Sequence, residues 1–470
     1  MTPAGIDPFG TVHCFEPKAP VLQHARVRRR AAAVMTAVLV ACTGVTGLAR
    51  TWTVAPGGQG NGSAQAPFGR LQDAIDRAQP GDVVLVKAGR FVESVRTVRP
   101  GRMSAPIRIE AAAPGTVVLS APGRVLSVGH SDIQVTGLVL DGQYGPDDTV
   151  RVSSEAHRFV LQRCEVRRSS RDLIDMDAPH GVLIDHCLIH HALNAARGRT
   201  DAHGIAAGAV RSLHVRDTEI HTFSGDGVQV DPGRAAPGWT DVTLERLRIW
   251  LAPLPAAENG FPAGTVTGEN AVDTKASAAF DRSALTIRDV TAWGFRGGLL
   301  TNMAAFNLKE HVRVTVDRVT VFDSEIAFRL RGSGQGPSGG AAVTVSNAVV
   351  YSVGTAFRYE DRIRALRLTH VTLGERVARP FRGVNADADE VLVRNSLIVG
   401  PRPREFDGAT NLSVEAGTFV DPVKGNYRLV PGAGAIDTGA PTDVTTDRAG
   451  TPRPAGRAPD AGAFELTGRP

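Results

Sequence analysis

The segment GENAVDTK, residues 268–275, places a glutamate, an aspartate and a lysine among small and β-branched residues. In a strand, Asp273 and Lys275 are two positions apart and therefore point to the same face. A carboxylate beside an ammonium group can hold a cation, bind a charged substrate or transfer a proton. The same two residues also form ordinary surface ion pairs. The interpretation of this segment therefore depends on the elements that position the two side chains.

The composition narrows the fold classes to which this segment can belong. The chain has 470 residues, of which 51 are glycine and only 5% are aromatic. Its apolar segments are rich in valine, isoleucine, leucine and threonine, which favour strands, and the frequent glycines favour turns. We therefore expect an all-β protein. The formal net charge of +5 indicates no particular class of partner, and we expect a monomer that does not bind nucleic acid.

Residues 1–49 have the features of an export leader. From Val27 the sequence VRRRAAAVMTAVLVACTGVTGLA has a basic start, an apolar run and a small-residue end, which is the layout of a secretory signal. The residues LVAC also resemble a bacterial lipobox, so either lipidation of Cys42 or cleavage after Ala49 is expected. We expect no membrane span elsewhere in the chain. The predicted location is secreted or periplasmic, or the outer surface as a lipoprotein.

Ten segments share the pattern apolar-x-apolar-x-polar-x-x-apolar and begin 23 to 43 residues apart. Repeats of this length without helical spacing predict a β-solenoid, in which each repeat is one coil. Cys164 and Cys187 occupy the same place in adjacent repeats, so we expect them in a buried row of small side chains rather than in a disulfide. The segments are IQVTGLVL, FVLQRCEV, VLIDHCLI, LHVRDTEI, VTLERLRI, LTIRDVTA, VTVDRVTV, VTVSNAVV, LRLTHVTL and VLVRNSLI.

The two ends of the exported chain also have distinctive patterns. Thr51 to Phe91 reads as a strand, a glycine-rich loop, a short amphipathic helix over Leu71 and Ile75, the residues PGD and a second strand; residues 426–465 begin NYRLVPGAGAIDTGAP and end DAGAFE. Together with the repeat, these segments resemble the right-handed parallel β-helix proteins of the pectate-lyase type. The resemblance implies one right-handed parallel β-helix domain over residues 50–466, with an N-terminal cap at 51–100 and a C-terminal cap at 410–466. Because this fold hosts lyases, hydrolases, epimerases and adhesins, it implies no single reaction.

A second set of strands is expected between the repeats, and GENAVDTK falls in it. Alignment of these strands puts two rows of residues on the outer face. One row includes Gln229, Asp273, Leu300 and Arg329, and the other includes Asp231, Lys275, Asn302 and Arg331. Since neighbouring strands lie about 4.8 Å apart, Asp231, Asp273 and Lys275 are predicted to share one patch. The strands are DLIDMD (172–177), HGIAAG (203–208), DGVQVD (226–231), NAVDTK (270–275), GLLTN (298–302), AFRLR (327–331) and AFRYE (356–360).

A patch that is acidic at one end and basic at the other suits an acidic polysaccharide. A uronate lyase removes the proton next to a carboxylate, and a cation bound to that carboxylate makes the proton more acidic. Calcium prefers carboxylate and carbonyl oxygens, and the resemblance implies calcium-assisted lyases that use aspartates from neighbouring coils and a lysine or arginine base. Lys275 is the predicted base, with Asp273 and His203 as further catalytic candidates. The predicted calcium ligands are Asp226, Asp231, Glu269 and Asp273, and the predicted substrate-binding residues are Arg329, Arg331, Asn302 and Gln229.

Other interpretations remain open. A glycoside hydrolase would use two of these aspartates as acid and base, and a non-catalytic surface protein would only bind a glycan. The Asp273–Lys275 pair is compatible with an ordinary ion pair, and His203 with a hydrogen-bonded turn residue.

Two further clusters are candidate metal sites. Asp172, Asp175 and Asp177 form an alternative calcium cluster. In HCLIHH, residues 186–191, strand alternation places His190 and His191 on different faces, which argues against a zinc site.

Overall fold

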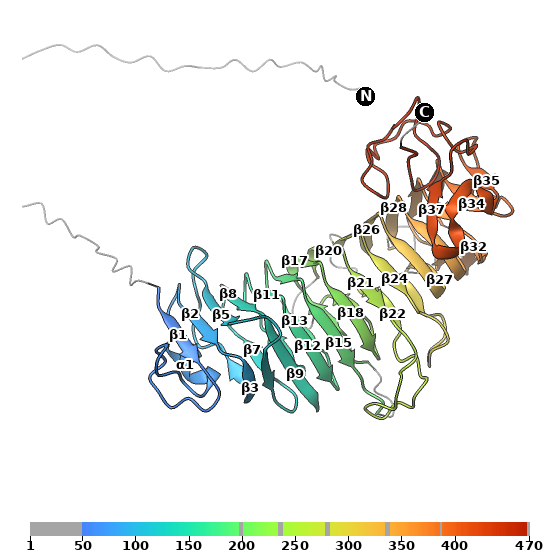
Figure 1. Cartoon of the computed structure of the whole chain (residues 1–470). Helices are drawn as coiled ribbons and strands as arrows, with labels where there is room; N and C mark the ends of the chain where they lie inside the picture. The colour runs from blue at the N-terminus through green and yellow to red at the C-terminus, as the bar shows by residue number, and fades with distance from the viewer. Residues whose placement is uncertain are drawn as a thin grey trace, which may run out of the picture. The chain divides into compact units, whose positions relative to one another are not determined.

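The computed structural model describes residues 49–196, 201–233, 238–277, 283–333, 339–385 and 388–467. The predicted leader and Cys42 lie outside the described residues. Ala49–Pro470 form one compact unit, and its coils follow one another along the chain from α1 and β1 to β35 (Figure 1). No helix in the described part of the chain is long and apolar enough to cross a membrane.

Each coil of the β-helix consists of up to three short strands, which pair in parallel with the equivalent strands of the next coil. The first strands form one sheet, and this sheet contains the first half of each sequence repeat. They are β1 (Thr51–Val54), β2 (Val83–Val86), β5 (Ile107–Ala111), β8 (Ile133–Thr136), β11 (Val160–Gln162), β14 (Leu183–Asp185), β17 (Arg211–Arg216), β20 (Thr240–Glu245), β23 (Ser283–Arg288), β26 (Val312–Asp317), β28 (Ala342–Ser346), β30 (Ala365–Thr369) and β33 (Val391–Arg394).

The second strands contain the other half of each repeat. They are β3 (Gly89–Val92), β6 (Val117–Ser120), β9 (Leu138–Gly145), β12 (Glu165–Ser169), β15 (Leu188–Ala192), β18 (Glu219–Phe223), β21 (Arg248–Trp250), β24 (Thr291–Trp293), the first halves of β27 (Thr320–Arg331) and β29 (Val349–Glu360), β31 (Thr372–Leu373), β34 (Leu397–Val399) and β35 (Leu412–Val414).

The third strands carry the predicted site. They are β4 (Val95–Arg96), β7 (Leu126–Val128), β10 (Val150–Val152), β13 (Ile174–Asp177), β16 (Ile205–Gly208), β19 (Val228–Asp231), β22 (Asn270–Thr274), β25 (Ala304–Leu308), the second halves of β27 and β29, and β32 (Val377–Val384). Alternate residues of all three strands point inward. The predicted parallel β-helix is therefore confirmed.

The corner between the first and second strands explains the polar position of the repeat. Nine residues there have φ between 49° and 57°, a left-handed conformation that turns the chain sharply within one residue. Side chains in this row bond from coil to coil: Arg246 donates two hydrogen bonds to Asp217, and Arg318 donates two to Asp289. The nine residues are Arg163, His186, Asp217, Arg246, Asp289, Arg318, Asn347, His370 and Asn395.

The core is a stack of aligned apolar side chains. In the later coils, Phe306, Phe328, Phe357 and Phe381 stack in sequence, with ring centroids 5.1, 5.0 and 5.6 Å apart. Such pairs contribute roughly 0.5–1.5 kcal/mol each beyond the area that they bury, and they fix which residue of each strand points inward. Cys164 and Cys187 are buried and free, as predicted.

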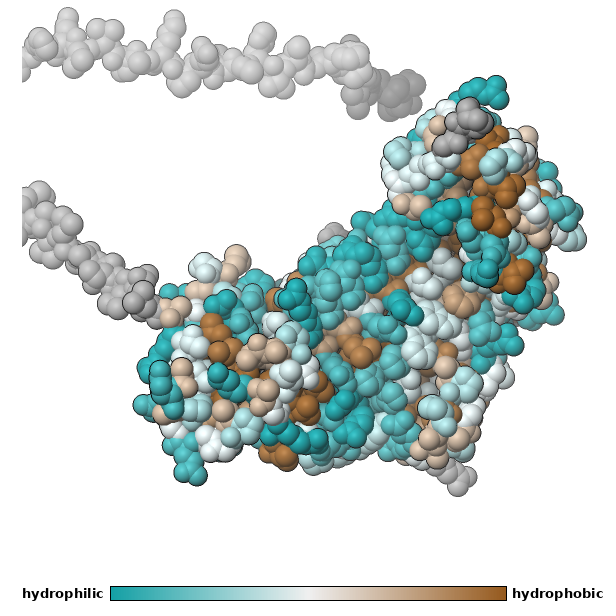
Figure 2. Space-filling model, in the orientation of Figure 1, coloured by the Kyte–Doolittle hydropathy of each residue, from teal (hydrophilic) through white to brown (hydrophobic). Residues whose placement is uncertain are grey.

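Both ends of the stack are closed by irregular segments. The predicted N-terminal helix is α1 (Leu71–Arg77), and it buries Leu71, Ala74 and Ile75. After β35, two short 3₁₀ turns (Ala416–Thr418 and Pro422–Lys424) alternate with the antiparallel pair β36 (Phe419–Asp421) and β37 (Asn426–Leu429). Figure 2 shows hydrophilic residues over much of the middle coils on this face and apolar patches towards both ends of the compact unit.

Candidate functional site

The outer face of the third strands carries the predicted charged rows. The register pairs Gln229 with Asp273, Asp273 with Asn307, and Asn307 with Arg329. Asp175 belongs to the same row in an earlier coil, and Arg358 and Arg382 extend it in later coils. The face therefore changes from acidic to basic along the stack, as the alignment predicts.

One strand lies in a different place from the prediction. The sequence predicts a strand at residues 298–302, whereas β25 runs from Ala304 to Leu308. Leu299 is 61% exposed, and Phe306 enters the core in its place and stacks on Phe328. A phenylalanine buries more apolar surface in this row than a leucine would, which accounts for the shift in register.

The shift changes two members of the rows. Leu300 and Asn302 lie outside them, so their predicted positions are wrong, and Asn307 takes the place of Leu300. Lys309, two residues beyond Asn307, reaches the same patch. The sequence signal for β25 is the apolar Phe306, which matches the inward phenylalanines of the next two coils.

Asp273 is at the centre of this patch. Its side chain is 3% exposed, and its two oxygens lie 2.8 and 2.9 Å from Nζ of Lys309. Nδ2 of Asn307 also donates to it at 2.9 Å, and Nζ of Lys275 is 3.6 Å away. Lys309, which sequence reasoning missed, is thus the principal counterion of Asp273.

Lys275 lies at the edge of the patch. Its side chain is 47% exposed, and its ammonium group donates a hydrogen bond to Oε1 of Gln229. Gln229 donates in turn to Asp231, whose carboxylate also accepts from the backbone N–H of Gly233 at 2.7 Å. The structure therefore brings Lys275, Asp273, Gln229 and Asp231 together as predicted.

Asp226 and His203 belong to a polar row at the corner that precedes the third strands. In this row, each side chain accepts a hydrogen bond from a backbone N–H of the following coil. Oδ1 of Asp172 accepts from the N–H of His203, and Nδ1 of His203 accepts from the N–H of Asp226. Asn270 donates its side-chain amide to Asp226 and accepts from the backbone of Ala304. The row holds consecutive coils in register, and this accounts for the positions of both Asp226 and His203.

Glu269 lies beside this row. Burial, the charge of Asp226 and the neighbouring carboxyl group of Asp201 raise the pKa of Glu269 to about 7. Burial and the charge of Asp273 raise the pKa of Asp226 to about 8. Because the two carboxyl groups act on each other, they titrate together, and the pair retains a proton at a pH at which an ordinary carboxyl group is ionised.

Asp201 and Glu269 line two different depressions in the outer face. Asp201 and His203 line the first, which we call the acidic cleft and which has a volume of about 490 Å³. Glu269 lines the second, the amide cleft, of about 170 Å³. The acidic cleft is also lined by Arg124, Asp148, Arg151, Arg171, Asp172, Asp175, Met176, Asp177, Ala206, Gly208, Gln229, Asp231 and Gly233, and the amide cleft by Asn270, Leu300, Thr301, Asn302, Met303, Asn307 and Arg329.

The predicted substrate-binding residues divide among the clefts. Gln229 lines the acidic cleft, Arg329 and Asn302 line the amide cleft, and Arg331 lines a separate depression. Arg329 is held by two hydrogen bonds to Glu360, at 3.0 and 3.1 Å. Within the amide cleft, the buried Oδ1 of Asn307 has no hydrogen-bond partner, so it can accept a hydrogen bond from a bound hydroxyl or amide.

The four predicted calcium ligands do not fit a calcium site. Within the described residues they do not converge as a group of metal ligands, and three of them already bond to protein donors: Asp273 to Lys309 and Asn307, Asp226 to Asn270, and Asp231 to Gln229 and Gly233. Calcium takes six to eight oxygen ligands. We therefore derive no catalytic step that passes through calcium.

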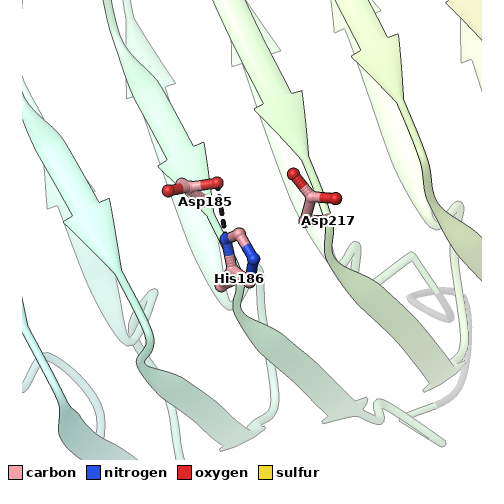
Figure 3. A group of neighbouring side chains, drawn as sticks. All are labelled: Asp185, His186 and Asp217. Atoms are coloured by element: carbon pink, nitrogen blue, oxygen red, sulfur yellow. Dashed lines mark hydrogen bonds and ion pairs between the residues drawn. The ribbon is translucent and has the colours of Figure 1, made fainter.

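Asp185, His186 and Asp217 are the single group of three metal-ligating residues that converge within the described residues (Figure 3). Arg216, Gln162 and His186 all bond to Asp185, and although burial opposes it, they lower its pKa to about 2. Arg246 occupies both oxygens of Asp217. These arginines already neutralise the carboxylates, so the group stabilises the corner rather than offering an open metal site.

The raised pKa values of Glu269 and Asp226 predict how stability depends on pH. From about pH 5 up to the raised pKa values of about 7 and about 8, the folded chain retains protons that the unfolded chain has already lost, so the free energy of unfolding falls as the pH rises through this range. Burial lowers the pKa values of His221 and His370, so these histidines make the free energy of unfolding rise with pH. Their effect is confined to pH values below about 6.5, the ordinary pKa of histidine. We expect urea midpoints to fall from about pH 6.5 to about pH 8, and to fall less for Asp226→Asn. A midpoint that is constant over this range in the wild type would contradict the raised pKa values of the two acids.

Comparisons with known proteins concern the fold. No family model matches the sequence, and a search of curated proteins finds no match. The structure is similar to that of pectate lyase Pel9A, with 15% identity, a TM-score of 0.46, and coverage of 89% of this chain and 96% of that chain. It is also similar to a rhamnogalacturonan lyase, with 13% identity, a TM-score of 0.47, and coverage of 79% of this chain and 90% of that chain. A third similar structure is a Family 28 exopolygalacturonase of Yersinia enterocolitica, with 13% identity, a TM-score of 0.40, and coverage of 73% of this chain and 78% of that chain. The pairing of its own strands makes the protein a parallel β-helix protein.

Proposed function

We propose that the protein is an exported enzyme that cleaves an acidic polysaccharide by hydrolysis. The observation that carries this proposal is Glu269, a half-buried carboxyl group with a raised pKa that lines the amide cleft, with Asp201 of the acidic cleft near it. A chain bound across both clefts would pass directly over a carboxyl group that still holds its proton near neutral pH.

In this mechanism Glu269 is the general acid. It gives its proton to the glycosidic oxygen as the bond to the anomeric carbon breaks, and a water molecule attacks that carbon from the opposite face. The proton of this water passes to a carboxylate of the acidic cleft. Asp201 keeps the proton on Glu269 before the reaction.

The basic end of the face supports an acidic substrate. Arg329, Arg331 and Arg358 lie there around the buried carboxylate of Glu360, and Arg331 also contacts Asp361. Two carboxylates cannot neutralise three guanidinium groups, so the region retains positive charge that attracts uronate carboxylates. Lys275 and Lys309 extend this charge towards Asp201 and Glu269.

Product analysis tests the proposal. We expect new reducing ends from at least one member of a panel of uronate-containing polysaccharides, without the ultraviolet absorbance of unsaturated products, and with the same rate in the presence of a chelator. Unsaturated products would instead identify a lyase. Retained binding of the polysaccharide without any cleavage would identify a glycan-binding protein.

The second candidate is a lyase in which Lys275 is the base, and calcium assistance is part of that prediction. It is favoured by the contact of Lys275 with Gln229 on the face that also carries Asp231. For a lyase, Lys275→Ala would lower turnover by orders of magnitude, because the proton acceptor is lost. For the hydrolase we expect Lys275→Ala to raise KM and to change kcat less than about tenfold. Measurement of kcat and KM on one cleaved substrate therefore separates the two reactions.

A further inference from the structure

A chain of titratable side chains lies outside both clefts, on the second strands of three neighbouring coils. Glu165 on β12 contacts His190 on β15, and His190 contacts the next residue, His191. His191 contacts Glu258, which lies in the long loop after β21, and Tyr144 at the end of β9 donates a hydrogen bond to Glu258. The proposed hydrolysis uses none of these residues.

The two histidines come together because His191 interrupts its strand. The register pairs His190 with His221 and Ala192 with Phe223, and His191 is left unpaired at φ 64°. In this left-handed conformation the side chain no longer follows the two-residue alternation of a strand. The prediction that strand alternation separates His190 from His191 is therefore wrong.

The carboxylate next to each ring assigns a role to its nitrogens. Nε2 of His190 lies 3.2 Å from Oε1 of Glu165, and Nε2 of His191 lies 3.5 Å from Oε2 of Glu258. A ring nitrogen that faces a carboxylate carries a hydrogen, so the other nitrogen of each neutral ring, Nδ1, has a free lone pair. The two Nδ1 atoms face each other at 2.5 Å. Two lone pairs in this position repel each other unless a cation lies between them.

We propose that His190 and His191 bind a late first-row transition-metal ion of the Zn²⁺, Cu²⁺ or Ni²⁺ type through their Nδ1 atoms. Imidazole nitrogens suit these ions. Metal-bound histidines characteristically donate their second N–H to a carboxylate, and Glu165 and Glu258 both take this position.

A small rotation of the rings creates the required space. Metal–nitrogen bonds of about 2.0 Å at a tetrahedral angle separate two nitrogens by roughly 3.3 Å, which is less than 1 Å more than their present separation. The histidine side chains are 14% and 25% exposed, so an ion has access to them and water can complete its coordination.

His221 limits the site to two histidine ligands. Its ring stacks on His190 with centroids 5.0 Å apart and planes 6° apart, so its nitrogens lie in a parallel plane and do not point at the ion. Nδ1 of His221 is also within 2.9 Å of the hydroxyl of Thr222. The ring instead supports His190 from below, and Trp250 supports His221 in the same way.

Metal titration of the chelator-treated full chain tests the proposal. Calorimetry with Zn²⁺ alone is expected to give one ion per chain, and electron paramagnetic resonance with Cu²⁺ alone is expected to give coupling to two nitrogens. Glu258→Gln is expected to weaken Zn²⁺ binding about 10- to 100-fold, and His190→Asn and His191→Asn to weaken it further. His186→Asn, which alters a histidine in the Asp185 group instead, is the matched control and is expected to bind as the wild type does.

Circular dichroism establishes that each variant is folded, and Glu258→Gln provides a test on a loop residue outside the β-helix strands. The proposal is overturned if the wild type does not bind Zn²⁺, which would mean that a shared proton occupies the site. It is also overturned if both histidine variants bind as the wild type does, or if His186→Asn removes binding. None of these outcomes depends on the polysaccharide or on its cleavage.

Discussion

Glu269→Gln is expected to lower the turnover of the cleaved polysaccharide by about 10²- to 10⁴-fold, which is the usual contribution of general acid catalysis. Glutamine keeps the size of the side chain, but it has no acidic proton to give to the leaving oxygen. The effect should appear in kcat, with KM nearly unchanged, because the proton is transferred in the transition state. The rate of formation of reducing ends at saturating substrate measures it.

The neighbouring residues provide the controls for this variant. Asp201→Asn removes a negative charge that raises the pKa of Glu269, so the alkaline limb of the pH–rate profile is expected to move to lower pH. Glu325→Gln changes a glutamate that lines a separate cleft and should leave the kinetics unchanged. Full activity of a folded Glu269→Gln protein would exclude the proposed acid.

Glu465→Ala is expected to lower the free energy of unfolding by about 3–5 kcal/mol, because it leaves a buried arginine without its counterion. Glu465 accepts a hydrogen bond from Nη1 of Arg453 at 2.6 Å, and the two side chains are 0% and 1% exposed. Arg453 also donates to Asn347 at the corner of a coil, so the loss should loosen the attachment of the C-terminal segment. Urea unfolding followed by circular dichroism measures the change.

Two further variants test the cause of this loss. In the double variant Arg453→Met/Glu465→Leu neither charge is present, and most of the stability is expected to return. Arg457→Ala removes an arginine that is 91% exposed and 3.6 Å from Asp437, and it should change stability by less than about 1 kcal/mol. A loss of that small size for Glu465→Ala would contradict the role assigned to the buried pair.

The sequence predicts the coils well because each coil repeats one physical requirement. An inward apolar position followed by a tight polar corner recurs in every repeat, so the parallel β-helix, the terminal helix and the row shared by Gln229, Asp273 and Arg329 are all predicted. The prediction fails at residues 298–302, where two leucines resemble a strand. Only the stacking of Phe306 on the phenylalanine of the next coil distinguishes the true strand from that segment.

The site is less predictable because its chemistry arises between coils. Lys275 and Lys309 are both near Asp273, but which of them is closer depends on the register of β25. Asp201 lies in the irregular segment before β16 and acts on the pKa of Glu269, which is 68 positions away in the sequence, so no local pattern connects them. His191 deviates from strand alternation because of one left-handed residue, and in this chain such residues include arginine, serine and threonine as well as asparagine and aspartate.

The alternation of charge at the corners constrains how the number of coils can change in evolution. Asp217 bonds to Arg246 and Asp289 bonds to Arg318, so acidic and basic corners follow one another over four coils. Deletion of the coil that contains Arg246 alone would bring Asp217 against Asp289, and two like charges would meet. Deletion of that coil together with the next would bring Asp217 against Arg318 and restore an ion pair. In this part of the molecule, coils can therefore be gained or lost in pairs more easily than singly, which makes two coils the natural unit of lengthening.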